Sequence, residues 1–428
     1  MKLLLWCLLL LGFSSCIEVP NTYTQLPPGQ WRGILKLTEP GQDQTISIHN
    51  EEQKVTDYFE LPFNMEVTYE GDQMQVFLIN GEEKIQIEDA YIGRDLGTAK
   101  DTLRLNMTAY DTYMDGFYEE NFIEGYWTVN YKENYRIPYI ITYGQRHRFI
   151  SKPVNDTKDF SGKWKVVFDY EGDPYNAIGE FKQDGNDLSG TFLTETGDFR
   201  YLDGNAYGDK MRLSVFDGSH AFLFSGSMDS DTIYGEFRSG KHYKTNWYGV
   251  KDESFTLQDP NQMTKSDQSK AIDFSFPDTK GNTIKLSDTA YDGKVKLVSI
   301  MGTWCPNCKD ETAYLKALKN DPKYKDVEII SIAFERYRDE SKALAVLNNY
   351  KKVSGFEWPL LLGGYANKKE TGETFSFLDK IYSYPTLLFI DENNMVQHVH
   401  TGFSGPATSK YESTKKDLEN KLTELLSQ

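Results

Sequence analysis

From residue 302 the chain reads Gly302-Thr303-Trp304-Cys305-Pro306-Asn307-Cys308. An apolar run from Val295 to Met301 precedes it and predicts a buried strand, and apolar residues at helical spacing follow from Lys309 to Asn320. Cys305 therefore stands at the predicted N-terminus of a helix, where free backbone N–H groups and the helix dipole stabilise a thiolate. Pro306 suits the first helical turn, and Cys308, one turn further, is placed to resolve a mixed disulfide formed by Cys305.

The N-terminus predicts export and a lipid anchor. Lys2 and the apolar run Leu3 to Gly12 form a signal that is too short to span a membrane, and it ends in Phe13-Ser14-Ser15-Cys16. Small residues before a cysteine resemble a bacterial lipobox, which implies cleavage after residue 15 and acylation of Cys16. The alternative is an ordinary signal peptide. Residues 1–15 are interpreted as the signal and 16–29 as a tether.

The cysteine count supports redox chemistry. The chain has four cysteines, and Cys7 and Cys16 both belong to the N-terminal signal and its cleavage site. The pair Cys305 and Cys308 is then the one possible intramolecular disulfide. A disulfide across so short a loop stabilises a fold little, so chemistry explains the pair better than structure does.

The residues after position 270 predict a small mixed α/β domain over 271–428. Strands and helices alternate, and a hairpin and a helix end the chain. The expected segments after the first helix are strand 327–334, helix 339–352, strands 384–391 and 395–400, and helix 413–427.

Ser383-Tyr384-Pro385-Thr386 stands just before one of these strands, and Pro385 follows Cys305 by 80 positions. Together with the lead-in Phe274-Ser275-Phe276-Pro277-Asp278 and the Trp-Cys-Pro-Asn-Cys motif, it resembles the thioredoxin superfamily. The resemblance is to the membrane-anchored TlpA/ResA-like thiol-disulfide oxidoreductases. It implies a cis Pro385 facing Cys305, a Tyr384 backbone that pairs with substrate, and an inserted strand-helix element before Pro385.

The resemblance also implies roles for two further residues. Glu311 fits the family pattern C-x-x-C-x-x-E, in which the glutamate tunes the cysteines and relays protons. The alternative is a carboxylate that the helix dipole favours. The buried Asp of minimal thioredoxins is absent, because Ser299 stands six residues before Cys305. Trp304 is expected to pack beside the disulfide and to contact docked substrate.

The first 256 residues predict two β-rich modules, over 30–150 and 160–256, joined to the C-terminal domain by a polar linker, 257–270. Each module opens with Gly-x-Trp and has a late Ile-x-Gly-x-aromatic element, at Ile123 and Ile233. Short alternating runs between turn signals predict about eight antiparallel strands in each, as a meander closed into a barrel or sandwich. The whole layout is similar to lipoprotein reductases of Bacteroidetes.

Composition argues against nucleic-acid binding and for a β-rich chain. The 428 residues carry a formal charge of −17, which disfavours binding to nucleic acid. The aromatic fraction of 14% favours strands over long helices. No apolar stretch after the signal is long enough to span a bilayer.

Three other interpretations compete with thiol-disulfide exchange. A peroxiredoxin needs Pro-x-x-x-Thr/Ser-x-x-Cys, but Val298 and Gly302 occupy the first two of those positions. A zinc site would need ligands besides the two cysteines, and the candidates are His398 and His400. A binding lipoprotein, with the function in the β modules and a redox or docking accessory at its C-terminus, is the serious alternative.

The sequence thus predicts an enzyme that exchanges disulfides and needs no metal or organic cofactor. Reduction is the expected direction. Its expected partners are disulfide-containing exported proteins, a membrane electron donor and the bilayer that holds Cys16. The expected location is the cell envelope, with the redox domain in the periplasm.

Overall fold

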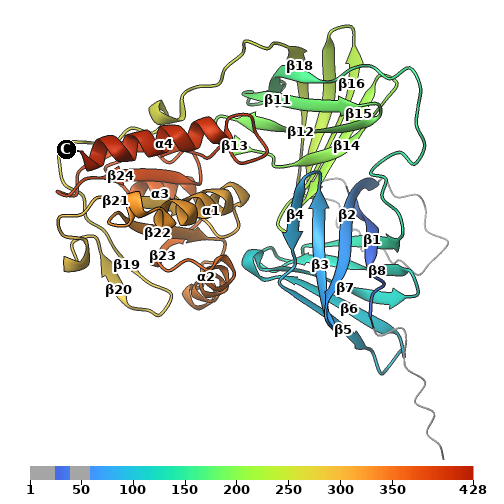
Figure 1. Ribbon diagram of the computed structural model, residues 1–428, viewed down its shortest axis with the longest axis horizontal. Helices are drawn as coiled ribbons and strands as arrows, with labels where there is room; N and C mark the ends of the chain where they lie inside the picture. The colour runs from blue at the N-terminus through green and yellow to red at the C-terminus, as the bar shows by residue number, and fades with distance from the viewer. Residues whose placement is uncertain (1–24, 39–57, 428) are drawn as a thin grey trace, which may run out of the picture.

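The structure, a computed structural model, describes residues 25–38 and 58–427. Two β modules and a C-terminal α/β domain follow one another along the chain (Figure 1). The expected signal and the lipidation site Cys16 lie outside the described residues. Within those ranges, no helix has the length and apolar character needed to cross a membrane.

The first module is one antiparallel sheet that curls without closing. Its strand order is β4-β3-β2-β1-β9-β8-β7-β6-β5, so β4 and β5 are the edges. The strands are β1 (Gly29–Thr38), β2 (Tyr58–Glu70), β3 (Gln73–Asn80), β4 (Glu83–Gln86), β5 (Asp89–Arg94), β6 (Asp101–Met107), β7 (Thr112–Glu119), β8 (Phe122–Val129) and β9 (Arg136–Tyr143), with the short helix η1 (Thr108–Tyr110) before β7.

The second module closes into a barrel of eight strands, because β11 pairs with both β10 and β12. A ninth strand of two residues, β13, extends the edge of β12. The strands are β10 (Gly162–Phe168), β11 (Tyr175–Asp184), β12 (Asp187–Thr194), β13 (Gly197–Asp198), β14 (Leu202–Tyr207), β15 (Lys210–Phe216), β16 (Ala221–Asp229), β17 (Thr232–Ser239) and β18 (Tyr243–Lys251). The prediction of β-rich, barrel-like modules is confirmed, and the second module closes as expected. For the first module the expected closure and strand number were wrong: its nine strands form an open sheet, because β4 and β5 do not pair with each other.

Both modules follow one plan around a buried tryptophan. The first strand of each pairs with the second and the last strand of its module. Trp31 and Trp164 are buried on these strands, and each donates its indole N–H to the carbonyl four residues earlier. The Gly-x-Trp motif thus marks the inward residue that fills each module.

The Ile-x-Gly-x-aromatic elements mark a second repeated feature. Gly125 on β8 lies opposite Gly116, and Gly235 on β17 lies opposite Gly226. A Cβ on Gly125 would lie 1.9 Å from a backbone carbonyl of the facing strand, and on Gly235 2.2 Å. Only glycine lets the two strands approach so closely.

The C-terminal domain has a five-stranded sheet of order β23-β22-β21-β24-β25. The central strand β21 is buried along its whole length. The elements are a hairpin of β19 (Ser275–Pro277) and β20 (Thr283–Lys285), strands β21 (Lys296–Met301), β22 (Glu328–Glu335), β23 (Leu360–Tyr365), β24 (Thr386–Ile390) and β25 (Val396–Thr401), and helices α1 (Pro306–Asn320), α2 (Glu340–Ser354), α3 (Lys368–Thr374) and α4 (Tyr411–Leu426). Strand β23 and helix α3 fill the interval before Pro385.

The segment 257–270 lies against the C-terminal domain. It contains the short helix η2 (Pro260–Gln262), and the Asn261 side chain bonds to Asp417 on α4 and to His400 on β25. Met263 is buried. Because it is docked, this segment limits how far the second module can move from the C-terminal domain.

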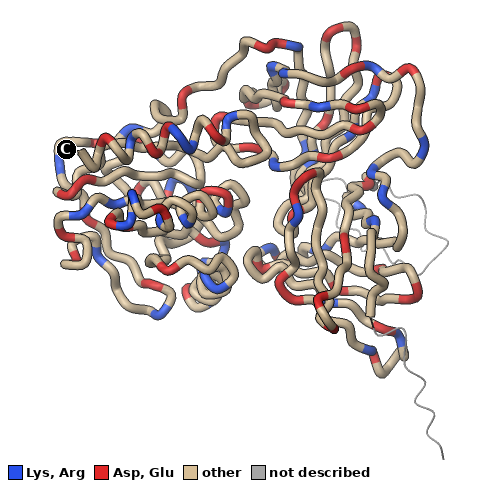
Figure 2. The backbone as a smooth tube through the Cα atoms, viewed as in Figure 1, with Lys and Arg blue, Asp and Glu red and all other residues tan. Residues whose placement is uncertain are grey.

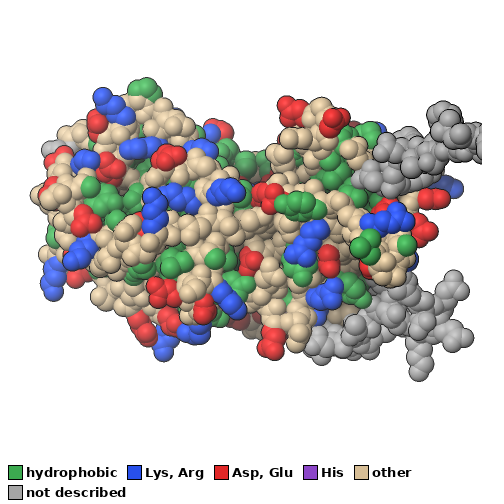
Figure 3. All heavy atoms as spheres, turned by 90° about the horizontal axis from the view of Figure 1, so that it is seen from below, with side chains coloured by type: hydrophobic (Ala, Val, Ile, Leu, Met, Phe, Trp, Pro, Cys, Tyr) green, Lys and Arg blue, Asp and Glu red, His purple; other side chains and the backbone are tan. Residues whose placement is uncertain are grey.

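Charges of both signs are spread over all three parts of the chain (Figure 2). The face seen from below also carries acidic and basic side chains side by side (Figure 3). The net charge of −17 is therefore distributed, and local pairs decide the electrostatics at any one site.

Trp164→Ala should destabilise the second barrel by about 3–5 kcal/mol, because it removes a buried ring and leaves a cavity. Urea unfolding followed by circular dichroism measures the loss. Tyr234→Ala, at a side chain that is 52% exposed on the same barrel, is the matched control and should shift the midpoint little. Equal shifts of the urea midpoint in the two variants would contradict the role of Trp164 in filling the barrel interior.

Candidate active site at the Cys305–Cys308 disulfide

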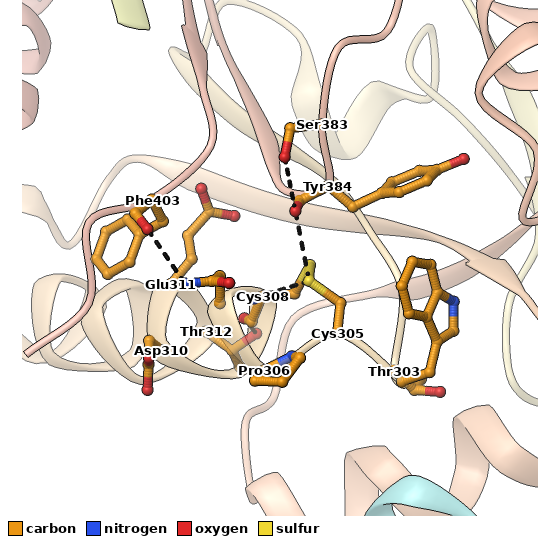
Figure 4. Close-up of a disulfide and its surroundings, with 12 residues drawn as sticks. Thr303, Cys305, Pro306, Cys308, Asp310, Glu311, Thr312, Ser383, Tyr384 and Phe403 are labelled. Carbon is orange, nitrogen blue, oxygen red and sulfur yellow. Dashed lines mark hydrogen bonds between the residues drawn. A yellow bond between two sulfur atoms is a disulfide. The ribbon is translucent and has the colours of Figure 1, made fainter. Parts of the chain in front are cut away.

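The two cysteines lie at the start of α1, directly after the turn that leaves β21. They form a disulfide with a Cα–Cα distance of 5.2 Å (Figure 4). Cys305 is the N-cap of α1, and the backbone N–H of Cys308 donates to its Sγ at 3.2 Å. Pro306 occupies the first helical position, where no N–H is needed. On reduction, the same N–H and the helix dipole favour a thiolate at Cys305.

The Tyr384–Pro385 peptide bond is cis, as the resemblance implies, and it faces the disulfide (Figure 4). The Sγ of Cys305 lies 3.4 Å from the backbone oxygen of Tyr384. The Ser383 hydroxyl donates to the same oxygen at 3.0 Å. Residues 79 positions apart in the sequence are thus brought into contact at the expected place.

Trp304 packs beside the disulfide. Its indole N–H donates to the backbone oxygen of Phe334 at 2.9 Å, and its ring meets the Tyr384 ring edge to face at 5.6 Å. The Arg336 guanidinium lies over the indole, 3.7 Å from the ring centroid. These three contacts hold the ring in one orientation.

Glu311 is buried on α1, three residues after Cys308. The Ser299 hydroxyl donates to its Oε2, while Oε1 has no hydrogen-bond partner among the described residues. Burial raises the pKa of Glu311 to about 8, and the bond from Ser299 offsets part of that rise. Ser299 occupies the position of the missing Asp, and its hydroxyl holds the Glu311 carboxyl by this hydrogen bond. The carboxyl can therefore hold or release a proton near neutral pH.

A second buried carboxyl, which the sequence reasoning missed, lies behind the active-site turn. Glu335 ends β22 and accepts hydrogen bonds from the backbone N–H and the hydroxyl of Thr303, at 3.0 and 2.8 Å. Burial raises the pKa of Glu335 to about 7. An acid directly after the apolar run from Ile329 to Phe334 was the available signal.

A turn of the second module covers the active site. The backbone oxygen of Thr196 accepts from the Ser383 hydroxyl at 3.0 Å. A Cβ on Gly402 would lie 2.6 Å from the same oxygen, so the two chains are in close contact. Cys305 itself is only 4% exposed. No sequence motif predicted this contact, because the segment around Thr196 has the pattern of an ordinary turn.

Hydrogen bonds from Asp198 tie this turn to the C-terminal domain. Its Oδ2 accepts from the backbone N–H of Gly405 at 2.6 Å and from the side chain of Asn307 at 3.1 Å. Burial raises the pKa of Asp198, and the nearby Arg200 guanidinium lowers it. Asn307, the second residue between the two cysteines, is thus bound directly to the second module.

Arg200 joins all three parts of the chain. Its guanidinium is buried and pairs with Glu83 of the first module and with Asp310 of α1, the latter at 2.7 Å. It also donates to the backbone oxygen of Pro306 at 3.3 Å. Burial raises the pKa of Asp310 to about 7 against the opposing effect of Arg200.

His398 and His400, the two candidate zinc ligands, lie on β25. The Nδ1 of His400 is 3.0 Å from the Asn261 side-chain oxygen, and burial lowers the pKa of His400 to about 4. In the described ranges, no group of three or more His, Cys, Asp or Glu side chains is arranged to hold a metal ion.

Comparisons with known proteins assign the C-terminal domain. The Redoxin family model matches residues 266–421. The thiol-disulfide oxidoreductase ResA of Bacillus subtilis is 30% identical over 137 residues, which are 32% of this chain and 68% of ResA. The chain belongs to the ResA-like thiol-disulfide oxidoreductases of the thioredoxin superfamily.

Two further matches accompany these. The thioredoxin-like protein YneN of Bacillus subtilis is 26% identical to this oxidoreductase over 155 residues, covering 36% of this chain and 76% of YneN. A solved thiol:disulfide interchange protein of the thioredoxin family from Chlorobium tepidum is 21% identical, with a TM-score of 0.29, and covers 38% of this chain and 99% of its own. The β modules lie outside the Redoxin match.

Glu311→Gln should change the pH dependence of stability. The pKa of Glu311 is higher in the folded chain than its usual value of 4.5, so folding favours the protonated form and stability falls as pH rises toward 8. In the oxidised protein, the variant should be more stable by on the order of 3 kcal/mol near pH 8, with the difference much smaller near pH 5. Thermal unfolding at both pH values measures this.

The matched control is Glu373→Gln, which removes an exposed carboxylate from α3. It should shift the unfolding temperature by the same small amount at both pH values. A Glu311→Gln variant that behaved in the same way would contradict the elevated pKa.

Arg200→Gln should expose the active site. Removing one partner from a buried ion pair costs about 3–5 kcal/mol, here in the contact between the second module and α1. The reduced variant should therefore react with iodoacetamide at Cys305 at least about tenfold faster, measured with Cys7 and Cys16 replaced by serine. Arg94→Gln, at an exposed ion pair with Asp101, is the control. Unchanged alkylation in both variants would show that this ion pair does not shield Cys305.

Proposed function

We propose that this oxidoreductase is a lipid-anchored reductase of disulfides in exported proteins. The observation that carries the proposal is the Cys305–Cys308 disulfide at the N-terminus of α1, facing the cis Tyr384–Pro385 bond. A helix N-terminus lowers the pKa of a thiol, and the backbone beside the cis-proline offers a partner for an extended substrate segment.

Exchange proceeds in two steps. In the reduced enzyme, the Cys305 thiolate attacks one sulfur of the substrate disulfide; a mixed disulfide forms and the other substrate sulfur leaves as a thiolate. Cys308 loses its proton and attacks the Sγ of Cys305, which releases the second substrate sulfur. Two electrons pass from the cysteine pair to the substrate, and Cys305–Cys308 is oxidised.

Four other residues support these steps in the proposal. Glu311 accepts the proton of Cys308, which its elevated pKa suits. Pro385 and the backbone of Tyr384 align the substrate segment. Trp304, held by its three contacts, forms the surface against which the substrate packs.

The cellular setting is part of the same proposal. An acylated Cys16 would hold the protein on a membrane surface, since two or more acyl chains on one residue anchor stably. The C-terminal domain would then work in the periplasm. Each turnover leaves the cysteine pair oxidised, so a membrane electron donor must reduce it again.

One observation favours a second candidate function. The turn around Thr196 covers the active site, and Cys305 is 4% exposed. In a binding lipoprotein, the β modules would carry the function and the C-terminal domain would serve as their redox or docking accessory. In the reductase, the turn around Thr196 must move aside for a protein substrate to reach Cys305.

The reduction potential of the Cys305–Cys308 pair separates these functions. It is measured on the full chain with Cys7→Ser and Cys16→Ser, equilibrated in dithiothreitol or glutathione buffers. A reduction potential of about −270 mV, like that of thioredoxin, is expected for a reductase. A reduction potential of about −120 mV would make the protein an oxidant and would contradict the proposed direction, reduction of the substrate. No reversible couple would favour the binding function.

The proposed roles of the two cysteines predict different behaviour for their alanine variants. Cys308→Ala should accumulate a mixed disulfide between Cys305 and a disulfide peptide, because nothing resolves it. Cys305→Ala should form none and should lose reductase activity. Mass spectrometry under non-reducing conditions detects the adduct. Full activity of Cys305→Ala would rule out the proposed nucleophile.

A further inference from the structure

A cleft lies where the two β modules meet the C-terminal domain, next to the active site. Its volume is about 350 Å³, near the lower end for small-molecule pockets. All three parts of the chain line it: Lys132 and Tyr135 from the first module, Phe222 and His242 from the second, and Trp304 and Arg336 from the C-terminal domain. We name these six residues the junction cleft.

Two cations face the junction cleft without an anionic partner. The Nζ of Lys132 lies 4.5 Å from the centroid of the Tyr135 ring, and the Cζ of Arg336 lies 3.7 Å from that of Trp304. Within the described residues, neither forms an ion pair with a carboxylate. Partial burial and the charge of Arg336 lower the pKa of Lys132 to about 8. An anion in the cleft would relieve this repulsion.

The carboxylates nearby already have partners. Asp217 is buried and accepts from the backbone N–H of His220, whose ring lies within 3.7 Å. Asp111 accepts from the Tyr337 hydroxyl and from the side chain of Asn130. Glu335, which attracts Arg336 electrostatically, is buried and accepts from the backbone N–H and the hydroxyl of Thr303. Each of these three carboxylates has hydrogen-bond donors of its own, and none forms an ion pair with Lys132 or Arg336.

The imidazole of His242 adds a neutral partner to the cleft. Burial and the charge of Lys132 lower the pKa of His242 to about 4, so it is uncharged at neutral pH. Its Nδ1 lies 3.1 Å from the Tyr135 hydroxyl. The cleft therefore combines two cations, one neutral polar ring and aromatic faces, a set that suits a carboxylate on an apolar or planar group.

We propose that the junction cleft binds a carboxylate carried beside the disulfide of the substrate. The inference rests on the proposed exchange at Cys305, and it names the substrate class: disulfides with an acidic neighbour. Trp304 forms a wall of the cleft and directly precedes Cys305 in the chain. A carboxylate bound here lies close to the sulfur that attacks. The volume admits one or two side chains, so the rest of the substrate must lie outside.

Two small aromatic disulfides test the charge requirement. Dithiobis(nitrobenzoate) carries a carboxylate on each ring, and dithiodipyridine is uncharged. With either, the Cys305 thiolate attacks one sulfur and releases an aryl thiolate or thione. Cys308 then displaces the second, so two electrons leave the cysteine pair. The full chain with Cys7→Ser and Cys16→Ser is reduced with dithiothreitol, freed of reductant and mixed with each reagent in a stopped-flow instrument.

The measured quantity is the ratio of the two second-order rate constants, carboxylate reagent over neutral reagent. The double variant Lys132→Gln, Arg336→Gln should lower this ratio about tenfold, because two favourable charge interactions are lost. Taking the ratio cancels changes in the reactivity or exposure of Cys305. Lys100→Gln is the control, since Lys100 also lies over an aromatic ring, that of Phe117, outside the cleft. It should leave the ratio unchanged.

Competition distinguishes a binding site from long-range attraction. Nitrobenzoate carries the same ring and carboxylate without a disulfide, and it should slow the reaction of dithiobis(nitrobenzoate) with the unaltered cleft but not with the double variant. If both reagents react and neither the ratio nor competition depends on the two cations, the inference is overturned and the proposed function stands. If neither reagent oxidises the cysteine pair, the proposed function itself fails, and the inference with it.

Discussion

The guanidinium of Arg200 lies where the two β modules and the C-terminal domain meet. It pairs with Glu83 from one module and with Asp310 from α1, and it donates to the backbone oxygen of Pro306 between the two cysteines. A buried cation is costly unless paired, so this residue is stable only when all three parts are in place. The position of the second module over the active site depends on this contact.

The oxidoreductase keeps several acids where water is excluded. Glu311 and Glu335 lie under and behind the active-site turn, and Asp310 faces Arg200, and the pKa of each is raised into the range from about 7 to about 8. A group with such a pKa exchanges protons readily near neutral pH, as thiol chemistry requires. Glu311 and Glu335 therefore lie beside the redox pair, and Asp310 lies at the contact between domains.

The β modules do more than precede the redox domain. Each is a sheet built around a buried tryptophan and a close glycine pair, which makes it a firm support for its loops. From this support the turn at Thr196 reaches the cis-proline side of the disulfide, and Lys132 and Phe222 reach the side of Trp304. The modules thus shape both approaches to Cys305.

Local signals in the sequence determined the C-terminal fold and the place of the cysteine pair, because a strand, a C-x-x-C motif and a helix stand next to one another in the chain. The cis Pro385 was expected only from the resemblance to a known family. Turn signals and alternation likewise determined the two β modules. Only the tertiary structure decided that Asp198 and Arg200 bind the active-site helix and that Lys132 and Arg336 share a cleft. Those contacts join residues more than 100 positions apart through single side chains, and such pairs leave no periodic pattern in the sequence.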